Sequence, residues 1–372
     1  MRITCNRRVL HEALQHVSRV VSGRTTLPIL SNVLLEAKGE ALRIVAYDME
    51  IGAQSTVAIQ AQEQGALTVP ARVLVDVVAS LPDATVEMQS QDRSILALSC
   101  GRSEYTINGL PAEEYPNLPE VTGDLAIEIT QAAMRDLIRS TIFAASRDET
   151  RAILTGVLLE RDGDSVKMVA TDSYRLAVKT AGGDQVKVKG GDEKWQAIIP
   201  ARALQELNRM LDPAAEETPV KITAGEQQIM FAVGPYLLIS RLIEGQFPNY
   251  GRLLAGEPNR VLSVSRDDLL GAIKRAAIVA RAEASKLMFR AANGTLTISA
   301  ESGDVGRAHE ELPVTLEGAE IEIAFNAEYL TDALGVMESE NVVWHLTSPE
   351  SPGLVKRSDD PDYIYVVMPM RL

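Results

Sequence analysis

TRAILTGVLLERDGDSVKMVATDSYRLA, residues 150–177, decides the fold, because most of it occurs a second time earlier in the chain. LSNVLLEAKGEALRIVAYDME, residues 30–50, aligns with residues 154–174 without a gap. Nine of these 21 aligned positions are identical: Leu30/Leu154, Val33/Val157, Leu34/Leu158, Leu35/Leu159, Glu36/Glu160, Gly39/Gly163, Val45/Val169, Ala46/Ala170 and Asp48/Asp172. A shorter third version, LMFRAANGTLTISAE, occupies residues 287–301. Internal repetition of this kind predicts three domains of one design.

The length of 372 residues fits three domains of about 120 residues, each large enough to bury its own core. No apolar run approaches the roughly 20 residues that a membrane span needs. The N-terminal MRITCNRRVL lacks the apolar core of an export signal. Cys5 and Cys100 are too few for a disulfide framework and are expected to be buried free thiols. We therefore expect a cytoplasmic protein without a membrane partner.

The repeat unit is predicted to be α+β. Each third begins with a short strand and an amphipathic helix, over residues 6–21, 130–145 and 265–280, and Ser265 is expected to be an N-cap. Strands paired around Gly39, Gly163 and Gly294 follow. A second strand then leads into a second helix, over residues 67–78, 197–208 and 323–334. Further strands end each third at tyrosine-led segments, over residues 105–110, 236–242 and 363–368.

Two connectors rich in Pro, Gly and Asn separate the thirds. They are EYPNLPEVTGD at residues 114–124 and FPNYGRLLAGEPNR at residues 247–260. The predicted domains are therefore residues 1–124, 125–257 and 258–372.

The charge is unevenly distributed. The chain has 37 Lys and Arg against 51 Asp and Glu, a formal net charge of −14. That total alone argues against nucleic acid, but a basic surface within an acidic protein gives the same sum. Basic residues recur on the predicted helices and the loops after them, which suits contact with a duplex backbone. For any single arginine, the alternative is a solvated helix face.

Motifs for catalysis are absent from the sequence. It has no Gly-rich phosphate loop, no dinucleotide fingerprint, no HExxH and no Gly-x-Ser-x-Gly. The repeated Asp48 and Asp172 could form a paired-carboxylate site, but turn aspartates repeated with their turn are the favoured interpretation. We expect no catalytic residue, no metal and no cofactor. The alternative is a repeat-built enzyme with an interdomain site near Asp172.

Four blocks carry a family resemblance: RTTLPILSNVLLEA at residues 24–37, TRAILTGVLLE with VATDSYRLA, FPNY, and the terminal YVVMPMRL. In this order they resemble the bacterial sliding clamp family, the beta subunit of DNA polymerase III. The resemblance implies three domains, each with two helices backed by antiparallel sheets. Two chains would join head to tail into a ring around duplex DNA. The implied function is to make the replicative polymerase processive. A further alternative is a scaffold that binds only proteins, whose activity would not depend on DNA.

The resemblance also implies sites. A cleft between domains 2 and 3 would receive peptide motifs from the DNA polymerase III alpha subunit, the clamp loader, other polymerases and repair proteins. Its lining would be Arg151, Leu154, Thr171, Tyr174, Arg175, Leu176, Pro248, Arg252, Leu253, Val366, Val367, Met368, Pro369, Met370 and Arg371. The resemblance and the recurring basic residues together indicate the DNA-binding candidates, which are Arg24, Arg72, Arg135, Arg139, Arg147 and Arg202. The dimer interface would contain Tyr105, Ile107, Ile278 and Val279.

The C-terminal segment is too apolar to be a solvated end of the chain, and a chain end usually frays unless it is tied down. Met368, Pro369 and Met370 are therefore predicted to pack on the second domain near Leu176 and Pro248.

Overall fold

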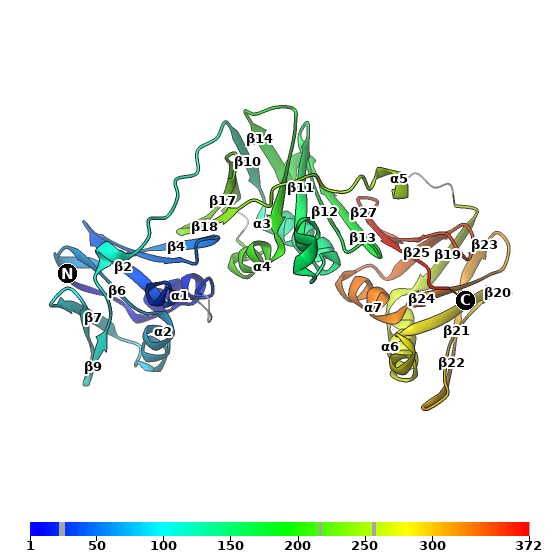
Figure 1. The fold of residues 1–372 in the computed structure, drawn as a ribbon, viewed down its shortest axis with the longest axis horizontal. Helices are drawn as coiled ribbons and strands as arrows, with labels where there is room; N and C mark the ends of the chain where they lie inside the picture. The colour runs from blue at the N-terminus through cyan, green and yellow to red at the C-terminus, as the bar shows by residue number, and fades with distance from the viewer. Residues whose placement is uncertain (22–26, 216–217, 255–257, 372) are drawn as a thin grey trace. The chain divides into compact units, whose positions relative to one another are not determined.

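The computed structural model describes residues 1–21, 27–215, 218–254 and 258–371. The chain folds as two compact units (Figure 1). Unit 1 consists of Met1–Arg135, Gln185–Asp192 and Arg202–Leu242, and unit 2 of Asp136–Asp184, Glu193–Ala201 and Ile243–Leu372. Each unit therefore combines the first or the third predicted domain with part of the second.

Unit 1 contains two antiparallel sheets. One has the strand order β5-β1-β7-β8-β9, with β1 Arg2–Asn6, β5 Gln60–Glu63, β7 Thr85–Gln91, β8 Ile95–Cys100 and β9 Ser103–Asn108. The other has nine strands in the order β14-β10-β16-β17-β18-β4-β3-β2-β6. Their bounds are β2 Asn32–Lys38, β3 Ala41–Tyr47, β4 Ile51–Ala58, β6 Gly65–Pro70, β10 Leu125–Ile129, β14 Val186–Lys189, β16 Val220–Ala224, β17 Gln228–Val233 and β18 Tyr236–Arg241.

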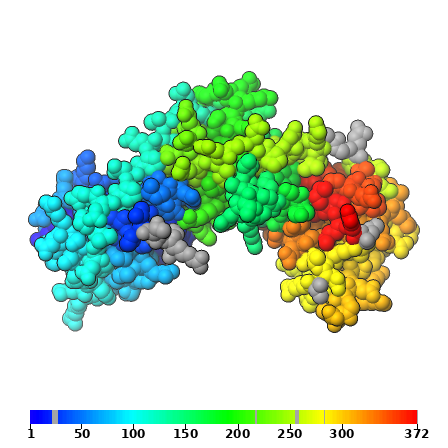
Figure 2. All heavy atoms as spheres, in the orientation of Figure 1, coloured from blue at the N-terminus to red at the C-terminus, as the bar shows by residue number. Residues whose placement is uncertain are grey.

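Unit 2 also contains two antiparallel sheets. Nine strands have the order β15-β11-β12-β13-β27-β26-β25-β19-β23, and four have the order β22-β21-β20-β24. The larger sheet consists of β11 Gly156–Asp162, β12 Ser165–Thr171, β13 Arg175–Ala181, β15 Lys194–Pro200, β19 Arg260–Ser265, β23 Thr315–Glu317, β25 Asn341–Leu346, β26 Gly353–Arg357 and β27 Tyr363–Val367. The smaller consists of β20 Lys286–Ala292, β21 Thr295–Ser302, β22 Gly306–Pro313 and β24 Ile321–Asn326. Figure 2 shows β27, in red, against the green segment that contains β13.

The described residues form seven α-helices, and all but the four-residue α5 bury apolar side chains. The helices are α1 Arg7–Ser18, α2 Ala71–Ser80, α3 Gln131–Thr141, α4 Ala201–Met210, α5 Gly251–Leu254, α6 Arg266–Ala280 and α7 Ala327–Val336. Helices α1 and α2 pack together in unit 1, as α6 and α7 do in unit 2. The predicted N-cap is confirmed, because the Ser265 hydroxyl accepts the Asp268 N–H at 3.4 Å. Among the described residues, no helix is both long and apolar enough to cross a membrane.

Local turns follow the repeat. Gly39, Gly163 and Gly294 have φ of 59°, 60° and 76° in three tight hairpins, as predicted. Cys5 and Cys100 are both buried free thiols, also as predicted, and burial raises the pKa of Cys5 to about 12.

Two helix ends differ from the prediction. Helix α1 ends at Ser18, and α3 ends at Thr141 and continues as a 3-10 turn, Ile142–Ala144. The Thr141 hydroxyl donates to the Leu137 carbonyl at 2.7 Å, a local bond that competes with regular helix geometry.

The tyrosine-led strands are not equivalent at their tyrosines. Isolated bridges join each of these chain segments to the strand that leads into the second helix: Thr68 to Leu110, Ile198 to Ile243 and Ala324 to Met370. Counting back from these bridges, Tyr105 corresponds to Leu238 and Tyr365. The sequence pattern had matched Tyr105 with Tyr236 and Tyr363, two residues out of step.

The C-terminal segment also differs in part. The Met368 N–H donates to the Tyr174 carbonyl at 2.9 Å, next to Leu176 as predicted. The Met370 N–H instead donates to Ala324 of β24 at 2.8 Å, within the C-terminal third. Met368 and Met370 are thus held by backbone hydrogen bonds to the β12–β13 turn and to β24.

Candidate functional site

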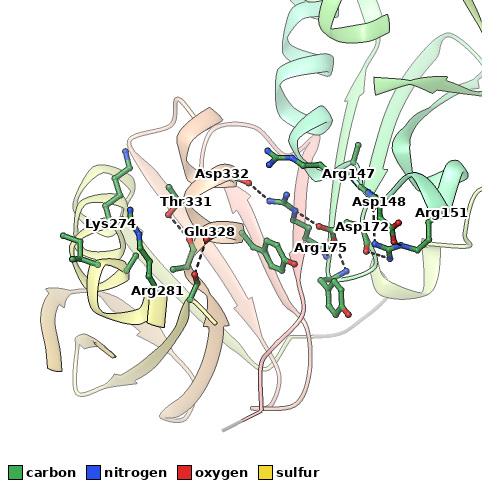
Figure 3. A pocket seen from close by; sticks show the side chains of 18 residues that line it. Arg147, Asp148, Arg151, Asp172, Arg175, Lys274, Arg281, Glu328, Thr331 and Asp332 are labelled. Carbon is green, nitrogen blue, oxygen red and sulfur yellow. Dashed lines mark hydrogen bonds and ion pairs between the residues drawn. The ribbon is translucent and has the colours of Figure 1, made fainter. Parts of the chain in front are cut away.

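Unit 2 contains a pocket of about 850 Å³ (Figure 3). It is lined by the segment around Arg147 and Arg151, by the turn between β12 and β13, and by helices α6 and α7. Residues far apart in sequence therefore meet here, and the β12–β13 turn lies between them.

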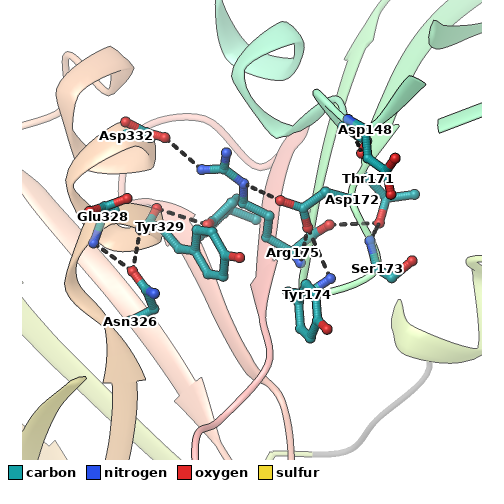
Figure 4. A network of polar contacts seen from close by, with 12 residues as sticks. Asp148, Thr171, Asp172, Ser173, Tyr174, Arg175, Asn326, Glu328, Tyr329 and Asp332 are labelled. Atoms are coloured by element: carbon teal, nitrogen blue, oxygen red, sulfur yellow. Dashed lines mark hydrogen bonds and ion pairs between the residues drawn. The ribbon is translucent and has the colours of Figure 1, made fainter. Parts of the chain in front are cut away.

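This turn is closed by Asp172 (Figure 4). One carboxylate oxygen accepts the N–H groups of Tyr174 and Arg175 at 2.9 and 3.0 Å. The Thr171 hydroxyl accepts the Ser173 N–H at 3.1 Å and donates to the Arg175 carbonyl at 2.7 Å. These bonds hold Ser173 at φ 82°, a conformation that non-glycine residues rarely adopt. The turn interpretation of Asp172 is confirmed.

Arg175 connects this turn to α7. Its side chain is 9% exposed, and it donates to the second oxygen of Asp172 at 3.0 Å and to Asp332 at 2.7 Å. The guanidinium also lies 4.6 Å from the ring centre of Tyr329. Burial lowers the pKa of Arg175, but the hydrogen bond to Asp332 and the neighbouring acidic groups outweigh it and raise that pKa. Arg175 thus joins the turn to α7, and removing either carboxylate would leave a buried cation less compensated.

Arg151 holds the opposite wall. It donates to Asp148 at 2.9 Å, to the Asp172 carbonyl at 3.0 Å and to the Ser146 hydroxyl at 3.1 Å. Thr150 donates to the Asp148 carboxylate through its hydroxyl and its N–H, which lowers the pKa of Asp148. The wall is therefore shaped by an internal hydrogen-bond network.

The pocket lining carries charges of both signs. Lys274 and Arg281 project from α6 and its following turn, and Arg147 reaches in from the other side (Figure 3). Four carboxylates, Asp148, Asp172, Glu328 and Asp332, also line it. Only the basic part of the lining suits a phosphate or carboxylate group. Within the described residues, no three His, Cys, Asp or Glu side chains cluster to hold a metal ion.

The opposite face of the same sheet is apolar. Leu158, Val169, Leu176, Val178, Ile198 and Val366 form a buried cluster there. Half-buried side chains cover it: Ile153, Ile243, Phe247, Tyr250, Leu254, Leu354 and Ile364. Such a layer of partly exposed apolar side chains can accept apolar anchors of a peptide.

The structure divides the predicted cleft residues between these two faces. Successive strand residues point to opposite faces, so Leu176 and Val366 join the apolar cluster while Arg175 and Val367 face the helices. Tyr174, 58% exposed, stacks 6.4 Å from Tyr329 at the turn. Leu154 is buried, Thr171 is in the turn, and the exposed or half-exposed members are Pro248, Arg252, Leu253, Met368, Pro369, Met370 and Arg371.

Sequence reasoning missed part of both faces. Phe247 and Tyr250 lie in the FPNY block itself, and strand alternation in residues 353–357 could have identified Leu354. Tyr329 and Asp332 gave no such signal, because only tertiary folding brings them to a turn about 157 residues away in sequence.

Three family models match the chain in succession: the DNA polymerase III beta subunit N-terminal domain at residues 1–119, central domain at 128–249 and C-terminal domain at 251–371. The chain belongs to this family. The beta sliding clamps of Pseudomonas aeruginosa and Escherichia coli are 36% and 35% identical to it over 374 residues, with 100% of each chain covered. The crystal structure of the P. aeruginosa DNA polymerase III subunit beta matches with a TM-score of 0.94 at 36% identity, covering 100% of both chains.

Membership in the beta clamp family confirms the predicted architecture of three α+β domains with antiparallel sheets. The family is non-catalytic, so the alternative of an enzyme with a site near Asp172 is wrong. Asp172 has a structural reason to recur, since it closes the same turn as Asp48 does in the first third.

The DNA-binding candidates of this clamp differ in their surroundings. Arg72 on α2 and Arg147 are exposed, and Arg135 on α3 is half-buried. Arg139 pairs with Glu338 at 3.3 Å, and Arg202 donates to Asp48 at 2.6 Å and to the Val20 carbonyl at 3.0 Å. Arg24 lies outside the described residues.

The dimer candidates of the clamp lie on β9 and α6. Tyr105 is 37% exposed on the edge strand β9, and Ile107 of the same strand is buried. Ile278 is 62% exposed near the end of α6, with Val279 half-buried beside it.

Proposed function

We propose that this chain is a DNA sliding clamp that confers processivity on the replicative polymerase by encircling duplex DNA. The observation that carries the proposal is full-length membership in the beta clamp family, with 36% identity and a TM-score of 0.94 to one crystal structure. A clamp works by tethering, which raises effective concentration without tight direct binding. A net charge of −14 is therefore compatible with this role. The proposed compartment is the cytoplasm, and the proposed domains remain residues 1–124, 125–257 and 258–372.

A head-to-tail homodimer is part of the proposal. Its support is the pattern of sheets that the described residues form: two contain nine strands each, and two others contain five and four. Pairing β9 of one copy with β22 of another would make a third nine-stranded sheet and leave neither edge free. The ring centres of Phe143 and Tyr365 lie 5.7 Å apart within unit 2. Counting from Thr130 and Ser265, which precede the first helices of their thirds, Phe143 corresponds to Ile278. Tyr365 corresponds to Tyr105 by the bridges described above. An Ile278–Tyr105 contact between copies is thus expected.

The apolar face of unit 2 is the proposed site for client peptides. The half-buried layer that covers Leu176 and Val366 would accept apolar side chains of the peptide, and Leu154 is buried as well. The exposed Arg252 and Leu253 would border the peptide. Phe247 and Tyr250 are added to the set proposed from sequence. The clients proposed are the polymerase alpha subunit, the clamp loader, and other polymerases and repair proteins with such motifs.

DNA is proposed to contact basic helix residues through its phosphates. Arg72, Arg135 and Arg147 are the favoured candidates, because Arg139 and Arg202 already have acidic partners. Phosphate contact gives weak affinity that falls with salt and depends little on sequence.

Retention on DNA of different topology tests the function. Protein loaded onto nicked circular DNA by a clamp loader should stay bound during gel filtration and be lost once the circle is linearised. The double variant Ile278→Asp/Val279→Asp, which should be monomeric by sedimentation, serves as the control and should not be retained. Equal retention on circular and linear DNA would contradict topological tethering.

A further inference from the structure

Two strands, β9 and β22, each form the outer edge of a small sheet (Figure 1). Free strand edges expose unpaired N–H and C=O groups that another strand can complete. The chain already contains two examples of how its repeats join across such edges, namely β18 with β4 and β13 with β27.

Both examples use one register. Leu237 lies opposite Gln54 in the first, and Ile364 opposite Val178 in the second. The bridges described above make Leu237 and Ile364 equivalent to each other, and both equivalent to Glu104. The template therefore repeats residue for residue across the two joins.

The same counting applies to β22. In the three hairpins, Val45 pairs with Gln54, Val169 with Val178, and Ser299 with His309. The strands β3, β12 and β21 are the second strands of the three equivalent glycine hairpins. Val45, Val169 and Ser299 each lie four residues after the first residue of these strands. His309 is thus the third member of the set formed by Gln54 and Val178.

We infer that two copies of this chain join with His309 directly opposite Glu104 and Glu311 opposite Arg102 of the second copy, so that the joint tightens when His309 is protonated. This inference rests on the homodimer of the proposed function. It adds the register and the charges that determine how firmly the joint closes. Opposite charges facing each other across a strand pair are stabilising.

The groups around His309 support this assignment. On its own strand, the exposed Glu311 lies 3.1 Å from the His309 ring, with Arg307 on the other side. From β21, Ser299 lies opposite His309, and Glu301 is engaged by Arg307 at 2.7 Å. From the second copy, the register brings Glu104 opposite, with Arg102 and Thr106 as its flanking outward-facing neighbours.

The sign of the pH dependence follows from these neighbours. Histidine ordinarily titrates near pH 6.5, within the range where small changes in surroundings matter. Pairing with Glu104 favours the protonated ring, so the added stability of the dimer is present below that pH. It is lost at higher pH, where a neutral ring no longer forms a charge pair across the strands.

The first test addresses the register. Ser103 and Glu310 should face each other as a close pair on the helix side, equivalent to Tyr363 and Lys179. The variant Ser103→Cys/Glu310→Cys should form covalent dimers on oxidation, seen on a denaturing gel. The matched control Ser103→Cys/Ala308→Cys, out of register by two residues, should cross-link much less. Preferential cross-linking of the control would overturn the register.

The second test addresses His309. The dissociation constant of the dimer should be about two- to fivefold lower per joint at pH 5.5 than at pH 8.0, the effect expected of one opposite-charge pair across two strands. Sedimentation at several concentrations measures it. His309→Gln and Glu104→Gln should each remove this pH dependence, and the double variant should behave like either single one. His345→Gln, a change elsewhere in unit 2, should retain it.

The outcomes separate the two proposals. A wild-type protein that stays monomeric at micromolar concentration would contradict the proposed dimer itself. A dimer whose affinity is unchanged between pH 8.0 and 5.5, or whose pH dependence survives Glu104→Gln, would overturn the role of His309 while leaving the clamp intact.

Discussion

The turns at Asp48 and Asp172 occupy the same position in the repeat and have the same backbone. In each, one carboxylate oxygen accepts two N–H groups, from Glu50 and Ile51 at 3.0 and 2.7 Å in the first turn. Both hold a non-glycine residue at positive φ, 77° at Met49 and 82° at Ser173. The local closure of the turn is therefore what the two copies share.

The second carboxylate oxygen is used differently. Asp48 accepts from Arg202 of α4, whose side chain is 44% exposed. Asp172 accepts from Arg175 of its own turn, which is 9% exposed and continues to Asp332 of α7. At Asp48, helix α4 of the next repeat supplies the cation. At Asp172, the equivalent helix α7 supplies a carboxylate instead, and the cation belongs to the turn itself. The same local turn thus supports two joins that differ in charge arrangement and in burial.

The largest effect is expected from Asp172→Ala. It removes the turn acceptor and leaves Arg175 buried with one partner, so the free energy of unfolding should fall by about 3–5 kcal/mol. The chain's two tryptophans, Trp195 and Trp344, both belong to unit 2, so their fluorescence in a urea titration reports this unit. A loss below about 1 kcal/mol would mean that the network in Figure 4 contributes little.

Asp48→Ala should have a smaller effect in unit 1. The same two N–H groups lose their acceptor, but Arg202 is exposed enough to be hydrated. The expected loss is about 1–2 kcal/mol. Hydrogen exchange of peptides that cover β4 and β18 measures it. If Asp48→Ala lowers the exchange protection of β4 and β18 as much as Asp172→Ala lowers that of β13 and β27, then the difference in burial does not determine the effect.

The smallest effect is expected from glycine in the two turns, and it should be equal in both. Met49→Gly and Ser173→Gly each relieve a left-handed backbone at a non-glycine residue, worth about 1 kcal/mol. Part of this gain is offset by the greater freedom of glycine in the unfolded chain. Urea titration and hydrogen exchange should show stabilisation of about 0.5 kcal/mol at each turn. Destabilisation at only one of them would show that the two backbones are not equivalent.

Much of the fold was predictable because it depends on local order. Hairpins at Gly39 and Gly163, the N-cap at Ser265 and the turn at Asp172 each require particular residues at short spacing. The 124-residue repeat then extended each local prediction to the next copy. Family blocks such as FPNY and YVVMPMRL identified the clamp from the sequence, although they did not indicate which face of the sheet each residue occupies.

Only the tertiary structure decided what depends on long-range register. Arg175 and Leu176 are neighbours in sequence but point to opposite faces of β13, toward α7 and toward the apolar cluster. Met370 pairs with Ala324, and Tyr105 corresponds to Tyr365 rather than Tyr363. The contacts of Arg175 and Met370 join residues far apart in sequence, up to 157 positions for Arg175 and Asp332, and their register is set by the packing of whole sheets and helices. The sequence by itself determined the repeat and its turns, because those need only neighbouring residues.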